Sequence, residues 1–597
     1  MTGRSKQIWV AAFAAVNLIL LIRTLAGWVG FVDSGELAVV CSTLGIAHPT
    51  GYPLYTLLGR ILTLVYPGEV IEAVSFVSLA ASLVSALLLL HALHLMFSRI
   101  DVFGGKTGFA LPAASFSTLL LLYNPIVWSL SVTNEVYALN LFFLAAVMFA
   151  IERFNSNRTT GATRTVAMIA YLLGLSFCNH SSTMFLAIGV LFWAFATVRV
   201  RSSLKSSLPI SLLLFATALT LFIYLPIRAS QSPLFNWGDP STIENFIRHA
   251  SGWQYRTWMF NKPLAEHLTS IFALVWMVLK QSPLILALPA IAGFTHLWRK
   301  DKAISGLLIV VFGLNIVFAA GYTIPEIDTY MLPSLFVYVF WVAVGTAYIC
   351  MLLVNLTNVK RASMLSSTIA AAIFLAAGIS MIISNWSRCD RSDYYYVDRQ
   401  TDILLDGFEH NAIFLTANWS FYSPLMYKQY VDGERQDVTA VDIELLRRSW
   451  YFDYLQQADP ALAERISAEK EAFLPLVRRF ERGLSYDVAE IENAYQAVIR
   501  ALATVPDRPV YIDHGSSFKD VNRFVKVPGG LAYRLLRADE SFQPKQPVEL
   551  TLGPIPDGLL EFDYMLEQQL RILDLMNRES KSYWEWYRIQ ENSNANP

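Results

Sequence analysis

The sequence predicts a mainly α-helical protein that crosses a membrane many times and ends in a smaller α/β domain. The membrane part is predicted by composition, because 54% of the 597 residues are hydrophobic and only 16% are charged. It is also predicted by apolar windows that recur through the first two thirds of the chain. After Asn385 the composition changes to mixed charge. We therefore expect a transmembrane domain at residues 1–385 and a second domain at residues 386–597.

Apolar windows near the length that a bilayer core requires, about 17 to 25 residues, predict eleven spans. The first window follows a short basic stretch and lacks a small-residue cleavage pattern, so we interpret it as a retained signal-anchor helix. A further apolar segment, 264–280, is interpreted as an interfacial helix that leads into the next span. The eleven windows are 8–28, 72–97, 109–130, 136–152, 165–178, 182–198, 208–227, 281–298, 303–321, 331–357 and 364–384.

The distribution of charge predicts the orientation. Residues 1–385 hold 22 of the 46 Lys and Arg but only 13 of the 47 Asp and Glu. If the N-terminus is cytoplasmic, 15 of these 22 basic residues lie on the inner side and ten of the 13 acids lie in outer loops, as the positive-inside rule requires. An odd number of spans then places residues 386–597 outside, so the functional face is expected to be the outer one.

The C-terminal part alternates helix-like and strand-like segments. AIFLTA and PVYID are typical of buried strands, and AEIENAYQAVIRALAT is typical of an amphipathic helix. This pattern predicts a small α/β domain, which could hold an acceptor. The four cysteines have no metal-type spacing, so neither a zinc site nor a disulfide framework is expected. The sequence contains no phosphate-binding Gly-rich loop, nucleophile elbow, His-Glu-x-x-His motif or basic nucleic-acid patch.

Two carboxylates stand in the first outer loop, in the stretch FVDSGE. Asp33 and Glu36 are three residues apart, so a helix that begins here would place both on nearly one face. The spacing is that of a capping box and also that of a catalytic pair, and both alternatives stay open for Glu36. For Asp33 we favour catalysis, because the rigid turn HPTGYP follows at residues 48–53. Its His48 is either a satisfied polar group or a contact for phosphate or substrate.

Other outer positions carry candidate polar groups. Glu135 either caps a span or lines a pocket with the first loop. Asn179 and His180 interrupt an apolar segment, where they either pair with neighbouring helices or serve function. Arg228 follows an apolar span directly, at a depth suited to binding a phosphate with two hydrogen bonds, although snorkelling to the interface is the alternative.

Aromatic and polar residues in the outer loops are candidates for a sugar or acceptor pocket. Aromatic belts at membrane interfaces have the same composition, so this alternative stays open. The candidates besides Glu135 are Tyr52, Tyr137, Asn236, Trp237, Asp239, Trp253, Tyr255 and Asp328.

These residues stand in an ordered set of motifs. DSGE is followed by LGIAHPTGYPLY, NEVYALN, FCNH, YLPIR with FNWGDP, HASGWQY and IPEIDTYMLP. In this order the motifs resemble those of bacterial relatives of the eukaryotic transmembrane protein O-mannosyltransferase family, over about residues 8 to 385. The resemblance implies the multispan GT-C glycosyltransferase fold in a bacterial inner membrane, with the N-terminus cytoplasmic and the C-terminal domain periplasmic.

The resemblance also implies a reaction. A sugar, mannose or another hexose, would move from a polyprenyl phosphate to a hydroxyl of a protein Ser or Thr, or of an envelope glycan or lipid. Asp33 would be the general base of this inverting transfer, with Glu36 beside it. Arg228, His48, His180 and Asn179 would bind the donor phosphate. No cofactor is required, a divalent metal is allowed but not indicated, and no nucleic-acid partner is expected. A carboxylate at the bilayer surface can remove a hydroxyl proton if its pKa rises moderately.

A transporter of a small solute or lipid is the main alternative, because many spans with polar groups also describe carriers. Carriers usually have repeated halves with broken helices in matching positions, and the sequence has neither. A noncatalytic sensor is a third alternative, but it leaves the polar early loops without a role.

Overall fold

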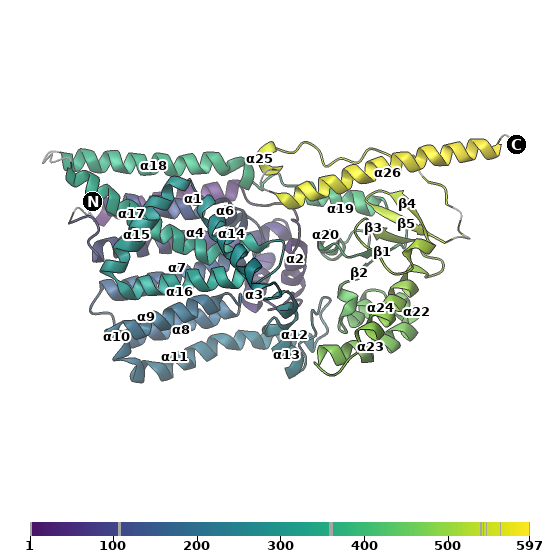
Figure 1. Ribbon diagram of the computed structural model, residues 1–597, viewed down its shortest axis with the longest axis horizontal. Coiled ribbons are helices and arrows are strands. Elements are labelled where there is room, and N and C mark those ends of the chain that lie inside the picture. Colours follow the sequence, from purple (N-terminus) through teal and green to yellow (C-terminus); the bar gives the residue numbers. More distant parts are fainter. Residues whose placement is uncertain are drawn as a thin grey trace.

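The computed structural model describes residues 3–105, 109–356, 362–537, 540, 542–544, 546–560 and 563–595, which form two parts (Figure 1). The first part consists of helices that run mostly along the long axis of the molecule. The second contains a small sheet with helices around it, and the long helix α26 (Tyr564–Ala595) runs beside that sheet (Figure 1). The predicted fold class, mainly helical with several apolar helices and a small C-terminal sheet, is confirmed.

The first part runs from α1 to α18 and includes several short helices between the long ones. Its elements are α1 (Gly3–Arg23), α2 (Ser34–Thr43), α3 (Pro53–Val65), α4 (Val70–Arg99), α5 (Ala110–Leu122), α6 (Pro125–Val132), α7 (Tyr137–Ser156), α8 (Ala162–Phe177), α9 (Thr183–Ala196), α10 (Val198–Arg201), α11 (Leu204–Leu219), η2 (Thr220–Ile223), α12 (Tyr224–Ala229), α13 (Ile243–Ala250), η3 (Trp253–Trp258), α14 (Leu264–Lys280), η4 (Leu284–Leu286), α15 (Ala287–Lys300), α16 (Lys302–Ala320), η5 (Ile327–Met331), α17 (Leu332–Leu356) and α18 (Ala362–Cys389).

Six helices of the described chain are long and apolar enough to cross a membrane, and up to eight are if each bent pair is one span. The predicted count of eleven is therefore not confirmed. The window 109–130 is broken at Asn124 and Pro125, where α5 and α6 bend by 71°. The windows 165–178 and 182–198 form α8 and α9, which are only 16 and 14 residues long. Residues 357–361, next to the last window, lie outside the described residues.

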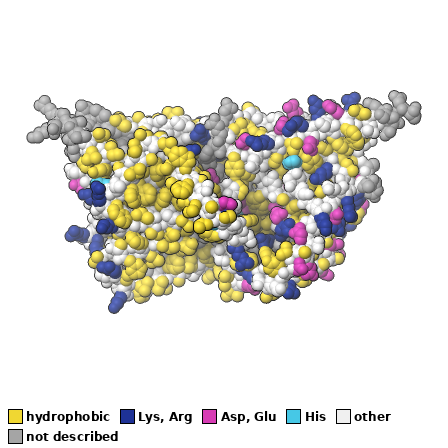
Figure 2. Space-filling model, in the orientation of Figure 1, with side chains coloured by type: hydrophobic (Ala, Val, Ile, Leu, Met, Phe, Trp, Pro, Cys, Tyr) yellow, Lys and Arg dark blue, Asp and Glu magenta, His cyan; other side chains and the backbone are white. Residues whose placement is uncertain are grey.

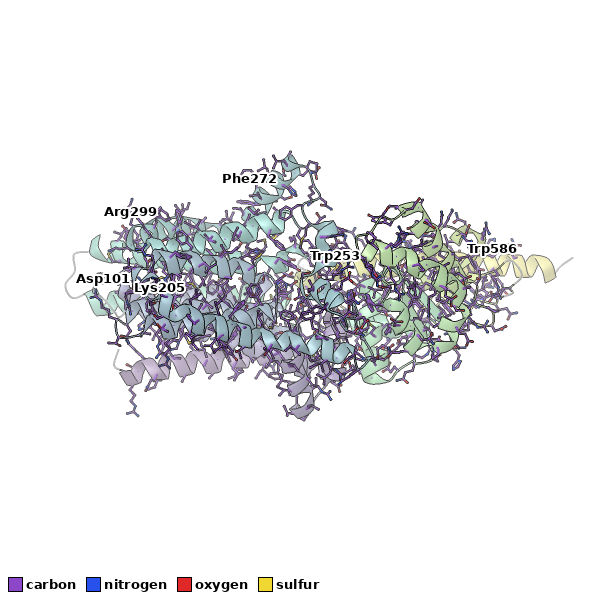
Figure 3. The ribbon with its side chains drawn as sticks, turned by 90° about the horizontal axis from the view of Figure 1, so that it is seen from below. Asp101, Lys205, Trp253, Phe272, Arg299 and Trp586 are labelled. Carbon is purple, nitrogen blue, oxygen red and sulfur yellow. The ribbon has the colours of Figure 1, made fainter. Side chains whose placement is uncertain are left out.

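The surface divides in the same way as the fold. Figure 2 shows hydrophobic side chains over most of the visible face of the helical part, whereas side chains of both charges gather on the C-terminal part. Lys205 and Arg299 lie at the end of the helical part farthest from the C-terminal part (Figure 3). Phe272 of α14 projects from the side of the bundle (Figure 3) and is 75% exposed. The helix α14 meets the following helices at 105°, and its interfacial placement stays a prediction.

The C-terminal part contains a five-stranded sheet in the order β2-β1-β3-β5-β4. Strands β2, β1 and β3 are parallel, and β5 and β4 complete the sheet in antiparallel pairs. The elements are α19 (Tyr396–Asp406), β1 (Ile413–Thr416), α20 (Trp419–Tyr427), η6 (Lys428–Asp432), β2 (Thr439–Asp442), η7 (Leu445–Arg447), α21 (Tyr451–Ala458), α22 (Pro460–Arg465), α23 (Ser467–Glu481), α24 (Val488–Ala503), β3 (Val510–Asp513), η8 (Val521–Arg523), β4 (Val525–Gly529), β5 (Ala532–Leu536), α25 (Asp557–Leu560) and α26.

Local sequence explains where the C-terminal elements begin. The predicted strands AIFLTA and PVYID form β1 and β3, and all four residues of each strand are buried. The predicted amphipathic helix is α24, and the Asp487 carboxylate caps it by accepting from the N–H groups of Ala489 and Glu490. The helix α18 ends at Cys389, four residues beyond the composition change. We propose that the two domains meet at this point.

Candidate active site

Asp33 lies at the start of α2, and its carboxylate does not bond the backbone N–H groups of that helix. It occupies the N-cap position but makes no side-chain capping hydrogen bond, so the capping box is not formed. Its Oδ1 accepts a hydrogen bond from the Trp419 indole N–H at 3.0 Å, and its Oδ2 lies 3.6 Å from His48 Nε2. The side chain is 28% exposed. Asp33 is thus a fixed carboxylate that a substrate can still reach.

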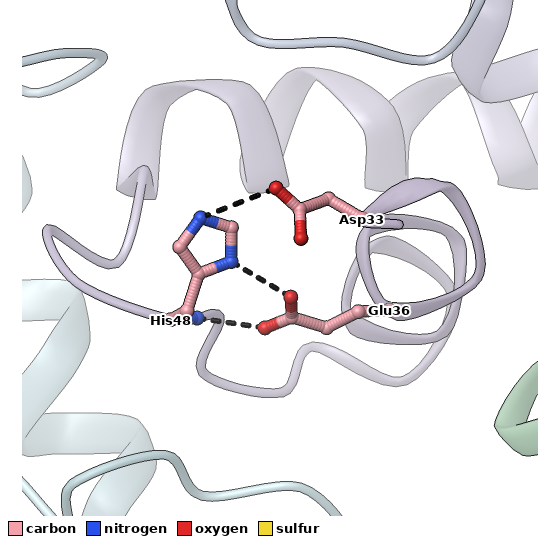
Figure 4. A group of neighbouring side chains, drawn as sticks. All are labelled: Asp33, Glu36 and His48. Carbon is pink, nitrogen blue, oxygen red and sulfur yellow. Dashed lines mark hydrogen bonds and ion pairs between the residues drawn. The ribbon is translucent and has the colours of Figure 1, made fainter. Parts of the chain in front are cut away.

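Glu36 lies one turn further along α2 and is completely buried. Its two carboxylate oxygens accept from His48, one from the backbone N–H and one from the ring Nδ1, both at 2.7 Å (Figure 4). The two acids therefore lie on one side of the helix, as predicted, but in different environments. Because both oxygens of Glu36 are occupied and no solvent reaches them, this carboxylate is suited to holding His48 and not to meeting a substrate.

The loop that carries His48 links α2 to α3 and reverses the chain tightly. Gly51 has a φ of 85°, a left-handed conformation that glycine adopts at low cost, and Pro53 begins α3 at a position where its missing N–H is not needed. The Tyr52 hydroxyl accepts from His48 Nε2 at 2.9 Å and donates to the Pro49 carbonyl. The ring of His48 is therefore fixed at both nitrogens.

The charges around His48 favour its protonated form. Burial alone would lower the pKa of His48, but the carboxylates of Glu36 and Asp33 outweigh burial and raise it to about 9. Burial raises the pKa of Glu36, and the neighbouring His48 cation opposes this effect. At neutral pH we therefore assign an imidazolium at His48 between two carboxylates.

The open side of Asp33 faces a cavity that both parts of the chain line. The outer loops of the helical part contribute Glu135, Tyr137, Glu326 and Asp328. Burial, with a smaller effect from the Asp33 charge, raises the pKa of Glu326 to about 8. The same two causes raise the pKa of Glu135 above its usual range. Near neutral pH the Glu326 carboxyl group is therefore mostly protonated and adds little negative charge to the cavity.

The C-terminal part contributes a buried guanidinium to the same cavity. Arg391 is 5% exposed and follows α18 directly. Its Nη1 donates to the Arg388 carbonyl at 3.0 Å, its Nη2 lies 3.9 Å from Asp563 Oδ2, and its guanidinium lies over the Tyr394 ring. No sequence pattern indicates Arg391, because it lies far from Asp33 along the chain.

Trp419 and Ser423 are further residues that sequence analysis missed, and both lie on α20. Ser423 Oγ accepts from the Glu36 backbone N–H at 2.9 Å, and Trp419 bonds Asp33. A Cβ at Gly35 would lie 2.1 Å from the Ser423 carbonyl oxygen, so α20 can approach α2 this closely only because residue 35 is glycine. No local pattern around TANWS indicates this contact.

Two of the residues predicted to bind the donor phosphate, His180 and Asn179, are buried and bonded to other parts of the chain. His180 lies behind the cavity, with its ring stacked on Tyr52 at 6.2 Å and its Nδ1 2.8 Å from Ser182 Oγ. The Asn179 amide donates to the Val136 carbonyl and is fully buried. Both residues pair with neighbouring segments, the alternative left open above.

Arg228 lies away from the cavity of Asp33. Its Nε donates to the Leu44 carbonyl at 2.8 Å and its Nη2 to the Thr43 carbonyl at 3.4 Å. These carbonyls belong to the C-terminal end of α2, where carbonyl groups lack partners within the helix. The position of Arg228 after an apolar span predicted its depth but not the direction of its side chain, so we do not retain it as a donor-phosphate ligand.

The predicted pocket residues separate into groups. Glu135, Tyr137 and Asp328 line the cavity of Asp33, and Tyr52 supports His48. Trp237 packs on Trp419, with ring centroids 5.6 Å apart. Tyr255 packs on Trp258 and is near enough to Asp33 and Glu36 for their charges to raise its pKa, after the larger effect of burial. The Asn236 amide bonds Asp239, and Asp239 and Trp253 line a second cavity.

Asp33, Glu36 and His48 are also a candidate metal cluster, because one ligand atom of each lies within 4.8 Å of the others. As arranged, both oxygens of Glu36 accept from His48, and Asp33 accepts from Trp419. A cation would therefore have to displace the proton on His48 Nε2 and would find Asp33 and His48 as direct ligands. The three side chains fit an imidazolium that is hydrogen-bonded to Glu36 and ion-paired with Asp33, and they fit a metal only after rearrangement.

Comparison with known proteins gives sequence relatives. Residues 33–204 match the model of the Protein O-mannosyl-transferase TMEM260 N-terminal domain. Protein O-mannosyl-transferase TMEM260 of Mus musculus is 27% identical over 473 residues, which cover 76% of this chain and 64% of that protein. The corresponding Dictyostelium discoideum protein is 23% identical over 576 residues, which cover 88% of this chain and 66% of that protein. The chain thus spans about two thirds of the length of these relatives.

Two solved structures also align with the chain. ArnT from Cupriavidus metallidurans bound to undecaprenyl phosphate aligns with a TM-score of 0.46 at 12% identity, over 74% of this chain and 92% of that chain. The same protein in the apo state aligns with a TM-score of 0.43 at 12% identity, over 75% and 91%.

The assignment of His48 predicts how stability depends on pH. A folded-state pKa raised to about 9 from the ordinary 6.5 contributes stability that is complete below about pH 6.5 and is lost as the pH rises through 9. The thermal unfolding midpoint of the purified protein in detergent should exceed that of His48→Gln at pH 6.5, and the difference should shrink by pH 10. A difference that is constant over this range would contradict an imidazolium at His48.

Proposed function

Because the chain is a relative of the TMEM260 protein O-mannosyl-transferases, we propose that it is a membrane glycosyltransferase of the GT-C type. It moves a sugar, mannose or another hexose, from a polyprenyl phosphate to a hydroxyl acceptor on the outer face of the membrane. The observation that carries this proposal is the partly exposed Asp33 carboxylate, which opens into the same cavity as the buried guanidinium of Arg391. A base and a phosphate ligand are the two groups that such a transfer requires.

In the proposed reaction Asp33 removes the proton of the acceptor hydroxyl. The hydroxyl oxygen forms a bond to the anomeric carbon while the bond from that carbon to the phosphate oxygen breaks, so the polyprenyl phosphate leaves with the bonding electrons. A single displacement inverts the anomeric carbon, and no enzyme nucleophile is needed. Trp419 and His48 hold the carboxylate toward the cavity, so that the base is in position before the acceptor arrives.

Arg391 takes the role of phosphate ligand that the sequence suggested for Arg228. A guanidinium binds phosphate oxygens through two parallel hydrogen bonds and keeps its charge when buried. Asp563, at 3.9 Å, accepts a hydrogen bond from the Tyr394 hydroxyl at 2.6 Å, which leaves part of the guanidinium available to an anion. The raised pKa of Glu326 also favours this role, because a protonated carboxyl group does not repel the phosphate.

The proposed orientation has the N-terminus in the cytoplasm and the C-terminal domain on the periplasmic side of a bacterial inner membrane. The basic end of the helical part lies opposite the C-terminal part (Figure 3), which supports this orientation through the positive-inside rule. The acceptor is a protein Ser or Thr or an envelope glycan or lipid, and the names of the sequence relatives favour a protein.

Asp33→Asn tests the proposed base. Transfer of radiolabelled hexose from a polyprenyl phosphate to acceptor should fall about 100- to 10,000-fold, the contribution that a positioned general base makes. Asp574→Asn, which removes an exposed carboxylate of α26, should leave the rate unchanged. Full activity in Asp33→Asn, with normal unfolding in detergent, would remove Asp33 from the mechanism.

Trp419→Phe tests whether the C-terminal domain positions the base. The substitution keeps an aromatic ring but removes the N–H that bonds Asp33. We expect kcat to fall about tenfold or more, as for loss of a hydrogen bond to a charged group, with the donor KM within about twofold of wild type. Trp586→Phe, at an exposed position of α26, is the matched control. An unchanged kcat in Trp419→Phe would separate α20 from the chemistry.

Removal of divalent metal tests the assignment of the Asp33, Glu36 and His48 cluster. Because the hydrogen bonds of His48 already occupy Glu36, transfer measured after dialysis against EDTA should equal that before dialysis. A loss of transfer that Mn²⁺ or Zn²⁺ restores would show that the cluster binds a metal in the working enzyme.

A further inference from the structure

A second cavity lies between the two parts of the chain, beside the loop that carries His48. One wall is formed by Pro49 and by outer-loop residues from Gly238 to Gln254, including Trp253 (Figure 3). The other wall is formed by residues 448–453 and by the end of α23. Nothing in the proposed chemistry uses this cavity, although it adjoins the active site through Pro49.

Arg448 is the main charged group of the cavity without a counterion. It is half-buried, and among the described residues its guanidinium makes no ion pair and no hydrogen bond. Burial lowers the pKa of Arg448, which reflects the cost of its charge in this place. The nearby Glu481 carboxylate is occupied, because it accepts from the Ser449 backbone N–H at 3.0 Å and from the Ser449 hydroxyl at 2.7 Å. An arginine does not lose its proton in proteins, so an anionic ligand would stabilise it.

The remaining charges leave a positive excess. Arg482 also lines the cavity, and its guanidinium makes no ion pair or hydrogen bond within the described part of the chain. Arg248 is paired with Glu244 at 2.8 Å, and the Asp239 carboxylate accepts from Asn236. With Arg478 and Asp453, the lining holds four arginines and three carboxylates, an excess of one positive charge.

His249 is a buried, neutral part of the cavity wall. Its side chain is only 3% exposed, and neither ring nitrogen has a hydrogen-bond partner. Burial, with the charge of His48, lowers its pKa to about 3, so the ring is neutral and carries one N–H. The ring lies against Gly51 and Gly238, where a Cβ would approach its nitrogens within 3 Å. Both nitrogens are enclosed by backbone, with the Ala47 carbonyl beside the ring, so His249 adds no charge to the cavity wall.

A row of aromatic rings links this cavity to the base. Trp419 bonds Asp33, Trp237 packs on Trp419 at 5.6 Å, and Trp450 packs on Trp237 at 5.3 Å and lines the cavity. About five residues of extended polypeptide would cover this span. One acceptor molecule can therefore reach both Asp33 and Arg448.

From these contacts we propose that the second cavity binds an acidic side chain of a polypeptide acceptor, about three to five residues from the hydroxyl that receives the sugar. Arg448 is the principal contact, and Arg482 adds to the positive potential. This inference rests on the proposed function, because it requires a polypeptide acceptor. An acidic residue near the hydroxyl would then be the feature by which the protein selects that acceptor.

Peptide binding to the full-length protein in detergent tests this proposal without requiring transfer. The probes are two fluorescent peptides with one Thr in a Gly-Ser sequence, of which one has Glu and the other Gln four residues from the Thr. Fluorescence anisotropy should give a Kd roughly tenfold lower for the Glu peptide, and Arg448→Gln should abolish this preference. Arg571→Gln, at an exposed position on α26, should retain it. Arg482→Gln should weaken it and serves if Arg448→Gln fails to fold.

Each other outcome overturns the proposal. Equal affinity of the wild-type protein for the two peptides, or a preference for Glu that persists in Arg448→Gln and in Arg482→Gln, would do so. A third outcome is that the two peptides bind equally well, and that inorganic phosphate displaces them from the wild-type protein but not from Arg448→Gln. In that case the cavity binds a phosphate and not an acidic residue. Because the assay measures binding alone, loss of activity in a transfer assay with the Glu preference intact would reject only the proposed function.

Discussion

The structure of the candidate site depends on the docking of α20 against α2. Gly35 has no side chain, so the Ser423 carbonyl can lie where a Cβ would otherwise be, and this approach brings Trp419 to Asp33 and Ser423 to the Glu36 backbone. A larger residue at position 35 would separate the two helices and withdraw the Trp419 N–H from Asp33. The C-terminal part therefore contributes to the candidate site through α20.

The second constraint is electrostatic. Burying a carboxylate is costly unless a cation or hydrogen bonds compensate it, and Glu36 is completely buried. The His48 imidazolium provides both, and it also faces Asp33. One positive charge thus lies against two carboxylates, of which only Asp33 is partly exposed. Two carboxylates three residues apart acquire different roles because one lies beneath the His48 loop and the other lies at a cavity.

The sequence predicted those parts of the site that are close along the chain. Asp33, Glu36 and His48 are separated by few residues and by a turn of Gly and Pro, so their proximity follows from local structure. Arg391 and Trp419 are more than 350 residues from Asp33, and no periodic pattern encodes contacts between separate domains. Arg228 shows the complementary limit, since hydropathy predicts depth but not side-chain direction. The predicted count of eleven spans is not confirmed, and hydropathy also averages across Asn124 and Pro125, where the chain bends by 71°.

The His48 loop also determines how two substrates could meet. In a single displacement the attacking hydroxyl approaches the anomeric carbon from the side opposite the leaving phosphate. In the proposed reaction the hydroxyl must enter on the open side of the Asp33 carboxylate, because His48 and Trp419 cover its other side. Pro49, next to His48, lines the second cavity, so an acceptor held there would have to pass the His48 loop to bring its hydroxyl to Asp33. The positive excess of that cavity and the guanidinium of Arg391 would therefore act on different molecules, one selecting the acceptor and the other stabilising the leaving group.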